Sequence, residues 1–245
     1  LQNYCVQWYV SHGQTDHLVE IGADLYKLPL QEKKAILCSC IYGIDIDIHA
    51  VEVAKFSLLI KLIEDETAPS VAEVVPILPD LSSNIHFGNS LVSHTEMTGI
   101  SGATHQMIDI VPFDWNKINE GNSFDAIIGN PPYVNTEGMH ALLPSAEFEI
   151  YKKKYRSAYK QFDKYFIFIE RAIDKVKDNG FVCYIVPNKF FKIGAGENLR
   201  DLIAKGKMLV SLDDFGDAQL FEDKTIYSSI VLLCKAEQTT FVYNS

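Results

Sequence analysis

The sequence lacks the features of membrane and secreted proteins. No hydrophobic run in the 245 residues approaches the roughly 20 residues that a transmembrane helix needs. The first residues, LQNYCVQWYVSHG, have neither the basic start nor the small-residue cleavage site of a signal peptide. The five cysteines are an odd number, and the run that holds Cys38 and Cys40 is typical of a buried strand rather than of a disulfide framework. We therefore expect a cytoplasmic protein in a reducing compartment.

Several catalytic signatures are also missing. The seven histidines are scattered, and no spacing of His and Cys suggests a zinc site, so we expect no metal. The chain has neither the GxxxxGK[ST] loop that cradles phosphates nor the GxSxG turn of hydrolases. It has no evident nuclease signature ending in E-x-K, so any endonuclease is expected outside this chain. These absences exclude the commonest nucleotide hydrolases, esterases and zinc enzymes.

Composition and charge fit a folded domain. With 47% hydrophobic and 22% charged residues, residues 1–245 can bury one core, which we interpret as one domain. The net charge of -10 argues against coating nucleic acid nonspecifically, because such binding needs Lys and Arg to neutralise phosphates. One local exception is the stretch 151–164, where basic residues, among them Lys152, Lys153 and Lys154, alternate with aromatic ones. This stretch predicts either a nucleic-acid contact or a solvated helix face.

Short apolar runs rich in β-branched residues alternate with helical segments along the chain. Such runs are typical of parallel strands buried on both faces. Strands are predicted at 35–44, 85–87, 124–128, 180–186, 208–215 and 228–233, and helices at 48–64 and 164–177. The last two strands have no convincing helix between them, which predicts an antiparallel hairpin at a sheet edge. The pattern predicts an open α/β fold with a mostly parallel sheet.

The sharpest motif is Asn130-Pro131-Pro132-Tyr133, which follows the apolar run 124–128. The two prolines cannot continue a strand ladder, so the motif predicts a stiff loop just beyond the carboxyl end of a buried strand. Open α/β sheets bind their ligands at that end.

The chemistry of this loop suits an exocyclic amine on a planar ring. The side-chain oxygen of Asn130 and the carbonyl of Pro131 can accept hydrogen bonds from an NH2 group, and the ring of Tyr133 can stack on the planar system. Two acceptors favour a tetrahedral nitrogen whose lone pair is free to attack an electrophilic methyl group. The same acceptors stabilise the positive charge that develops on that nitrogen.

Two further strand ends carry polar residues. In Gly43-Ile44-Asp45-Ile46-Asp47, Asp45 is a candidate to accept the ribose hydroxyls of a nucleotide, and Ile46 can pack on an adenine face. Asp47 is interpreted as the cap of the helix that follows. Asn89, at the end of the run 85–87, could contact a cofactor's adenine amine, although such a strand end is also a common turn.

Together and in this order, the motifs resemble the S-adenosylmethionine-dependent N6-adenine DNA methyltransferases of the gamma-type motif order, and in particular the methylase portion of single-chain type II (IIG-like) restriction-modification enzymes. The resemblance runs from about Ile36 to Cys234. It implies a Rossmann-like sheet and S-adenosylmethionine as cofactor. It assigns Asn130, Pro131, Pro132 and Tyr133 to the target adenine, which is flipped out of duplex DNA. The resemblance also puts a second aromatic residue, Phe221, against the flipped base.

The chain departs from this family in one respect. The family begins with a strand that ends in a glycine-rich loop at the methionine end of the cofactor, and no such sequence precedes Ile41. Residues 1–22 are similar to the helix that should follow that loop. We therefore expect a methyltransferase domain without its first strand, with target-recognition and nuclease domains elsewhere in a parent chain.

Two alternatives remain open. Glutamine methyltransferases that act on release factors, and some RNA guanine methylases, have a similar Asn-Pro-Pro-Tyr loop. The chain could also be a noncatalytic piece of the DNA enzyme, which the missing glycine loop favours.

Overall fold

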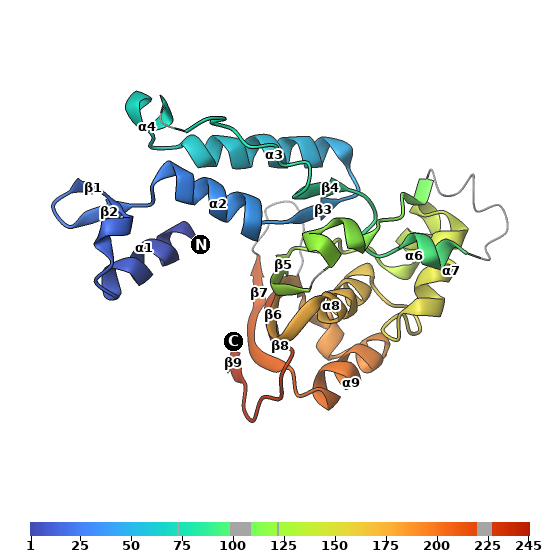
Figure 1. Cartoon of the computed structure of the whole chain (residues 1–245). Coiled ribbons are helices and arrows are strands. Elements are labelled where there is room, and N and C mark those ends of the chain that lie inside the picture. The colour runs from blue at the N-terminus through green and yellow to red at the C-terminus, as the bar shows by residue number, and fades with distance from the viewer. Residues whose placement is uncertain (73, 99–108, 122, 220–226) are drawn as a thin grey trace. The chain divides into compact units, whose positions relative to one another are not determined.

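The computed structural model describes residues 1–72, 74–98, 109–121, 123–219 and 227–245 (Figure 1). It divides into two compact units. The first unit comprises Leu1–Gly88 with Lys117–Asn119, and the second comprises Asn89–Asn116 with Glu120–Ser245. The expectation of a single methyltransferase domain over 1–245 stays a prediction.

The first unit combines helices with two small sheets. Its elements are α1 (Gln2–Ser11), η1 (Thr15–His17), β1 (Val19–Gly22), β2 (Leu25–Lys27), α2 (Leu30–Cys40), β3 (Gly43–Asp45), α3 (Ile48–Ile63), α4 (Ala68–Ala72) and β4 (Ile85–Phe87). β1 and β2 pair antiparallel, whereas β3 and β4 pair parallel. A small core forms where α2 and α3 pack together and α3 packs on β4, with Leu37, Val51 and Ile85 among its buried residues.

Two expectations for the first unit were wrong. The run 35–44 is not a strand, because α2 continues to Cys40 and only Gly43–Asp45 is extended. Leu30, Lys33 and Leu37 are buried at helical spacing, so packing of one face selects a helix here. The cysteines at 38 and 40 are therefore helical, half-buried and exposed respectively. The helix expected over residues 1–22 ends at Ser11.

The second unit contains a five-stranded mixed sheet. The strands are β5 (Phe124–Gly129), β6 (Val176–Pro187), β7 (Leu209–Gln219), β8 (Tyr227–Cys234) and β9 (Val242–Asn244), in the order β5-β6-β8-β7-β9. β5 is parallel to β6, and β7 to β9, whereas β8 runs antiparallel to both of its neighbours. The helices are α6 (Thr136–Leu142), α7 (Ser145–Lys154), α8 (Lys164–Lys175) and α9 (Glu197–Lys205). Short 3-10 turns lie at His94–Met97, Asn188–Phe191 and Gly194–Gly196, and two more, at Trp115–Lys117 and Asn119–Gly121, each contain residues of both units.

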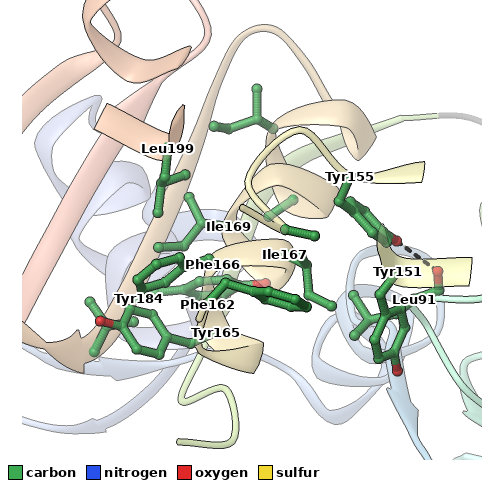
Figure 2. Packing of buried hydrophobic residues seen from close by; sticks show 14 of the residues in the cluster. Leu91, Tyr151, Tyr155, Phe162, Tyr165, Phe166, Ile167, Ile169, Tyr184 and Leu199 are labelled. Atoms are coloured by element: carbon green, nitrogen blue, oxygen red, sulfur yellow. Dashed lines mark hydrogen bonds between the residues drawn. The ribbon is translucent and has the colours of Figure 1, made fainter. Parts of the chain in front are cut away.

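The core of the second unit lies between this sheet and α8. Figure 2 shows its aromatic centre, where Phe162, Tyr165 and Phe166 lie close to Tyr184 of β6. The sheet contributes alternate residues to the core, for example Val182, Tyr184 and Val186, as a strand with one covered face should. The core thus fixes the sheet and the loops at its carboxyl end.

The strand predictions hold for this sheet with two corrections. The β7–β8 hairpin is antiparallel as expected, but β9 occupies the edge beside β7, so the hairpin is not at the edge. Among the described residues, β5 pairs only with β6, and Ile128 is 79% exposed, so β5 is not the buried strand that was predicted. An edge strand has one hydrogen-bonding neighbour, and its apolar residues need not all be covered.

In the part of the chain that the structure describes, no helix has both the length and the hydropathy to cross a membrane. The same described residues contain no cluster of three or more His, Cys, Asp or Glu side chains that could hold a metal ion.

Candidate functional site

The Asn130-Pro131-Pro132-Tyr133 loop starts immediately after β5, whose last residue is Gly129. Gly129 is paired in register with Tyr184 of the parallel strand β6, so the loop lies at the carboxyl edge of both strands. Asn130 is exposed and Pro131 is buried. The loop therefore presents a polar side chain at the edge where open α/β sheets bind ligands.

The side chain of Tyr133 is held at both ends. Its ring meets the ring of buried Tyr165 edge to face, with 6.2 Å between the centroids. Its hydroxyl lies 2.5 Å from the Oδ1 of Asn130 and donates toward the carbonyl of Ile185 over 3.0 Å. Burial raises the pKa of Tyr133, so the hydroxyl keeps its proton well above neutral pH.

The backbone that follows Tyr133 is also fixed. The carbonyl of Val134 accepts a hydrogen bond from the amide of Lys164 at the start of α8, over 2.8 Å. The side chain of Asn135 caps α6 by accepting from the amide of Gly138 over 2.8 Å. The Thr136 hydroxyl donates to the carbonyl of Phe162. The loop is thus a rigid platform, as its two prolines predicted.

Sequence reasoning missed a second polar pair near the carboxyl ends of these strands. The Nδ2 of Asn188, just beyond β6, donates to the Oδ1 of Asp214 on β7 over 2.8 Å. β6 and β7 are both antiparallel to β8, and Val186 and Asp214 are each paired with Ser229 of that strand. The sequence signal that could have indicated this pair is Asn188 itself, a polar residue directly after a proline, Pro187, that ends a strand.

In the first unit, the turn between β3 and α3 carries the proposed ribose contact. Asp45 is exposed, and its Oδ1 accepts from the amide of Asp47 over 2.8 Å, whereas its Oδ2 has no hydrogen-bond partner among the described residues. Ile46 is 48% exposed beside it. Asp47 caps α3 by accepting from the amide of His49, which confirms the predicted cap. A carboxylate oxygen at a strand end beside an apolar side chain fits a ribose and a purine face.

Asn89 belongs to the second unit and is 4% exposed. Its Nδ2 donates to the Oε1 of Glu147 over 2.9 Å, and its Oδ1 accepts from the amide of Leu91 over 3.1 Å. Glu147 is itself buried, accepts from the hydroxyl of Tyr151 and forms an ion pair with Lys164. Both ends of the Asn89 amide are therefore used within this network.

The three lysines at the end of α7 have different surroundings. Lys152 and Lys153 are exposed and have no ion-pair partner among the described residues. Lys154 is half-buried and forms an ion pair with Glu96. Only the first two are therefore free to meet a phosphate. Phe221 lies outside the described residues.

Solved structures show the class of fold. The chain matches the DrdV–DNA complex with a TM-score of 0.59 at 15% identity, covering 89% of this chain and 22% of that one. It matches the nuclease-deleted Type ISP restriction-modification enzyme LlaGI with a TM-score of 0.56 at 14% identity, covering 98% and 20%. For the M protein of the Type I restriction enzyme EcoKI, the TM-score is 0.52 at 13% identity, covering 92% and 35%. The chain thus has the α/β fold of the matched parts of these three structures, among them the M protein of a Type I restriction enzyme.

The family follows from sequence. Residues 39–221 match the Eco57I restriction-modification methylase family, and the chain belongs to it. The chain is 42% identical over 243 residues to the type II restriction enzyme and methyltransferase RM.Eco57I of Escherichia coli, covering 99% of this chain and 23% of that protein. It is 31% identical over 113 residues to the type II methyltransferase M.PaeR7I of Pseudomonas aeruginosa, covering 46% and 19%. The chain thus spans less than a quarter of the length of either relative.

Proposed function

We propose that this chain is the methylating part of a restriction-modification protein and that it transfers a methyl group from S-adenosylmethionine to N6 of adenine in DNA. The observation that carries the proposal is the rigid Asn130-Pro131-Pro132-Tyr133 loop at the carboxyl end of β5, in a member of a restriction-modification methylase family. The alternatives of a glutamine or RNA amine acceptor use the same loop. The relatives named as type II methyltransferases favour DNA.

The loop supplies acceptors for the reacting amine. The Oδ1 of Asn130 and the carbonyl of Pro131 accept hydrogen bonds from the two N–H groups, which turns the lone pair of the amine toward the methyl donor. S-Adenosylmethionine, when bound, supplies an electrophilic methyl group on a sulfonium. The N–C bond would form as the S–C bond of the donor breaks and a neutral thioether leaves. The two acceptors stabilise the positive charge that develops on the nitrogen, and one N–H proton then passes to water. The ring of Tyr133 stacks on the adenine.

We assign Asp45 and Ile46 of the first unit, and Asn89 of the second unit, to the cofactor. Asp45 has a carboxylate oxygen without a partner among the described residues, which suits the ribose hydroxyls, and exposed Ile46 suits the adenine face. As an acceptor for the adenine amine, Asn89 can contribute through the second lone pair of its Oδ1, since the amide of Leu91 uses the first.

The DNA has to deliver an unstacked base. Flipping an adenine out of duplex DNA costs a few kcal/mol, and stacking on Tyr133 and on Phe221 offsets part of that cost. Lys152 and Lys153, which are exposed and have no ion-pair partner among the described residues, are proposed to contact the phosphate backbone. Target-recognition and nuclease domains of a parent chain are proposed to choose the sequence and to cut.

The test uses the full-length protein that contains this chain and S-adenosylmethionine tritiated in its methyl group. Label in DNA that co-elutes with N6-methyl-2′-deoxyadenosine after digestion to nucleosides is the expected result. Asn130→Ala should lower that label at least about a hundredfold, because one electrostatic contact to the transition state is lost. The matched control is Asn198→Ala on α9, where the half-buried side chain donates to the carbonyl of Arg156 and full activity is expected.

The same assay separates the alternatives. Label in RNA or in a protein glutamine, with none in DNA, would replace the acceptor and keep the loop chemistry. Binding of S-adenosylmethionine without label in any acceptor would identify a noncatalytic piece and overturn the proposal.

A further inference from the structure

The hydroxyl of Tyr133 faces two oxygen atoms. The Oδ1 of Asn130 lies 2.5 Å away and the carbonyl oxygen of Ile185 lies 3.0 Å away. Both oxygens are acceptors, and a phenol has a single proton to donate. With the Asn130 amide in this orientation, only one of the two close contacts can be a hydrogen bond.

Turning the Asn130 amide over resolves the conflict. The two ends of an amide have nearly the same shape, and the assignment of its oxygen and nitrogen follows from the hydrogen bonds that they make. With the Nδ2 toward Tyr133, the phenol oxygen accepts from Asn130 while its proton goes to the carbonyl of Ile185. Each of the three groups then has a partner of the right kind.

This arrangement has a consequence for the reacting amine. Asn130 can serve as an acceptor only if its Oδ1 faces the substrate, because its own NH2 group would oppose another NH2 group. When the Tyr133 hydroxyl donates its proton to a backbone carbonyl, its oxygen can only accept from Asn130. The Nδ2 of Asn130 then faces the phenol, and the Oδ1 faces away from it. The carbonyl of Ile185 belongs to β6, inside the sheet, so its position is fixed and it fixes the direction in which the phenol donates.

We propose that the hydroxyl of Tyr133 is a positioning group that holds the Asn130 amide with its Nδ2 toward the phenol and its Oδ1 toward the substrate amine. That this orientation serves catalysis rests on the proposed function. The orientation itself can be tested on the protein without substrate. The role is separate from stacking, which needs only the ring. Tyr133→Phe removes the hydroxyl and keeps the ring, so it isolates this role.

A first experiment measures the orientation without any reaction. The full-length protein is labelled with 15N-asparagine, and NMR measures how fast the side-chain amide protons of Asn130 exchange with water. The signal that is missing in Asn130→Ala identifies these protons. Tyr133→Phe should accelerate the exchange of one of these protons about fivefold, as expected for a lost hydrogen bond. Tyr243→Phe, at an exposed position on β9, is the control and should leave the exchange unchanged. Equal exchange in the wild type and in Tyr133→Phe would overturn the inference.

A second experiment measures the coupling between the two residues. Single-turnover methyl transfer is compared for the wild type, Tyr133→Phe, Asn130→Ala and the double variant, with the acceptor that takes the tritium label. Tyr133→Phe should lower the rate about tenfold and leave the dissociation constant for the acceptor unchanged. The double variant should be no slower than Asn130→Ala, because the hydroxyl acts through that amide.

The outcomes are distinguishable. Multiplicative losses in the double variant, or a wild-type rate in Tyr133→Phe, would contradict the positioning role. A wild-type protein that transfers no methyl group would contradict the proposed function, and the exchange experiment would still decide the orientation of Asn130.

Discussion

The Nδ2 of Asn89 donates to the Oε1 of Glu147 over 2.9 Å, and both side chains are buried in the second unit. Asn89 follows β4 in the sequence, whereas Glu147 lies near the start of α7. The contact therefore ties the first residue of the second unit to the helix that carries the lysines proposed for DNA. The buried carboxylate also accepts from Tyr151 and lies 3.7 Å from the ammonium group of Lys164.

Replacing this carboxylate should destabilise the protein strongly. Glu147→Gln leaves the ammonium group of Lys164 buried without its counter-charge, and breaking such a pair costs about 3 kcal/mol or more. We expect a loss of about that size in the free energy of unfolding, measured by urea denaturation. The control is Glu149→Gln on the same helix, where the side chain is exposed and a change below about 0.5 kcal/mol is expected. Equal stability of the two variants would show that the network contributes little.

The first unit should lose stability in acid through Glu66. This carboxylate is buried and receives hydrogen bonds from Lys33, Lys27 and Ser70. Burial acts to raise its pKa, but the three hydrogen bonds outweigh burial and hold the pKa below the ordinary value of 4.5. A carboxyl group with a depressed pKa in the folded state stabilises the protein above 4.5, and that stabilisation disappears as the pH falls through the lower folded value.

The measurement is the urea midpoint of the wild type and of Glu66→Gln at pH values from about 7 to about 3. We expect Glu66→Gln to be less stable near neutral pH, with a difference that shrinks as the pH falls below 4.5. Glu64→Gln, at an exposed position paired with Lys61, serves as the control and should follow the wild type. A difference that does not depend on pH would contradict the assignment.

The end of α7 should contribute to DNA binding through two lysines only. Lys152 and Lys153 are exposed without an ion-pair partner among the described residues, whereas Lys154 is held by Glu96. The double variant Lys152→Ala, Lys153→Ala should weaken DNA binding and reduce the slope of log K against log salt by about 1.8, or 0.9 for each phosphate contact. Fluorescence anisotropy at several salt concentrations measures this slope. Lys154→Ala should lower stability and leave the slope unchanged, and the reverse result would reassign the contact.

Two neighbouring aspartates in the turn after β3 should separate cofactor binding from helix capping. Asp45→Ala should weaken binding of S-adenosylmethionine at least about tenfold in calorimetry, because hydrogen bonds from the ribose to a charged group are lost. Asp47→Ala should instead cost about 1 kcal/mol of stability, since it removes the cap on α3, and should leave the affinity nearly unchanged. Loss of affinity in Asp47→Ala alone would exchange the two roles.

Local patterns in the sequence predicted most strands and the stiff loop. β4, β5, β6 and the β7–β8 hairpin lie where the apolar runs indicated them, because each run is short and bounded by residues that end strands. The region 35–44 was predicted wrongly, since a short apolar run has the same composition in a strand and in a helix. There, burial of Leu30 and Leu37 on one helical face decided the outcome.

The sequence by itself determined the Asn130-Pro131-Pro132-Tyr133 loop and the cap at Asp47, because proline geometry and helix capping act between residues that are close in the chain. Only the tertiary structure decided three side-chain contacts. Asn89 donates to Glu147, Lys154 forms an ion pair with Glu96, and the hydroxyl of Tyr133 donates to the carbonyl of Ile185. The two hydrogen-bonded pairs lie 58 and 52 positions apart in the chain. Contacts of that kind depend on how α7, the sheet and the loop pack, which no local pattern specifies.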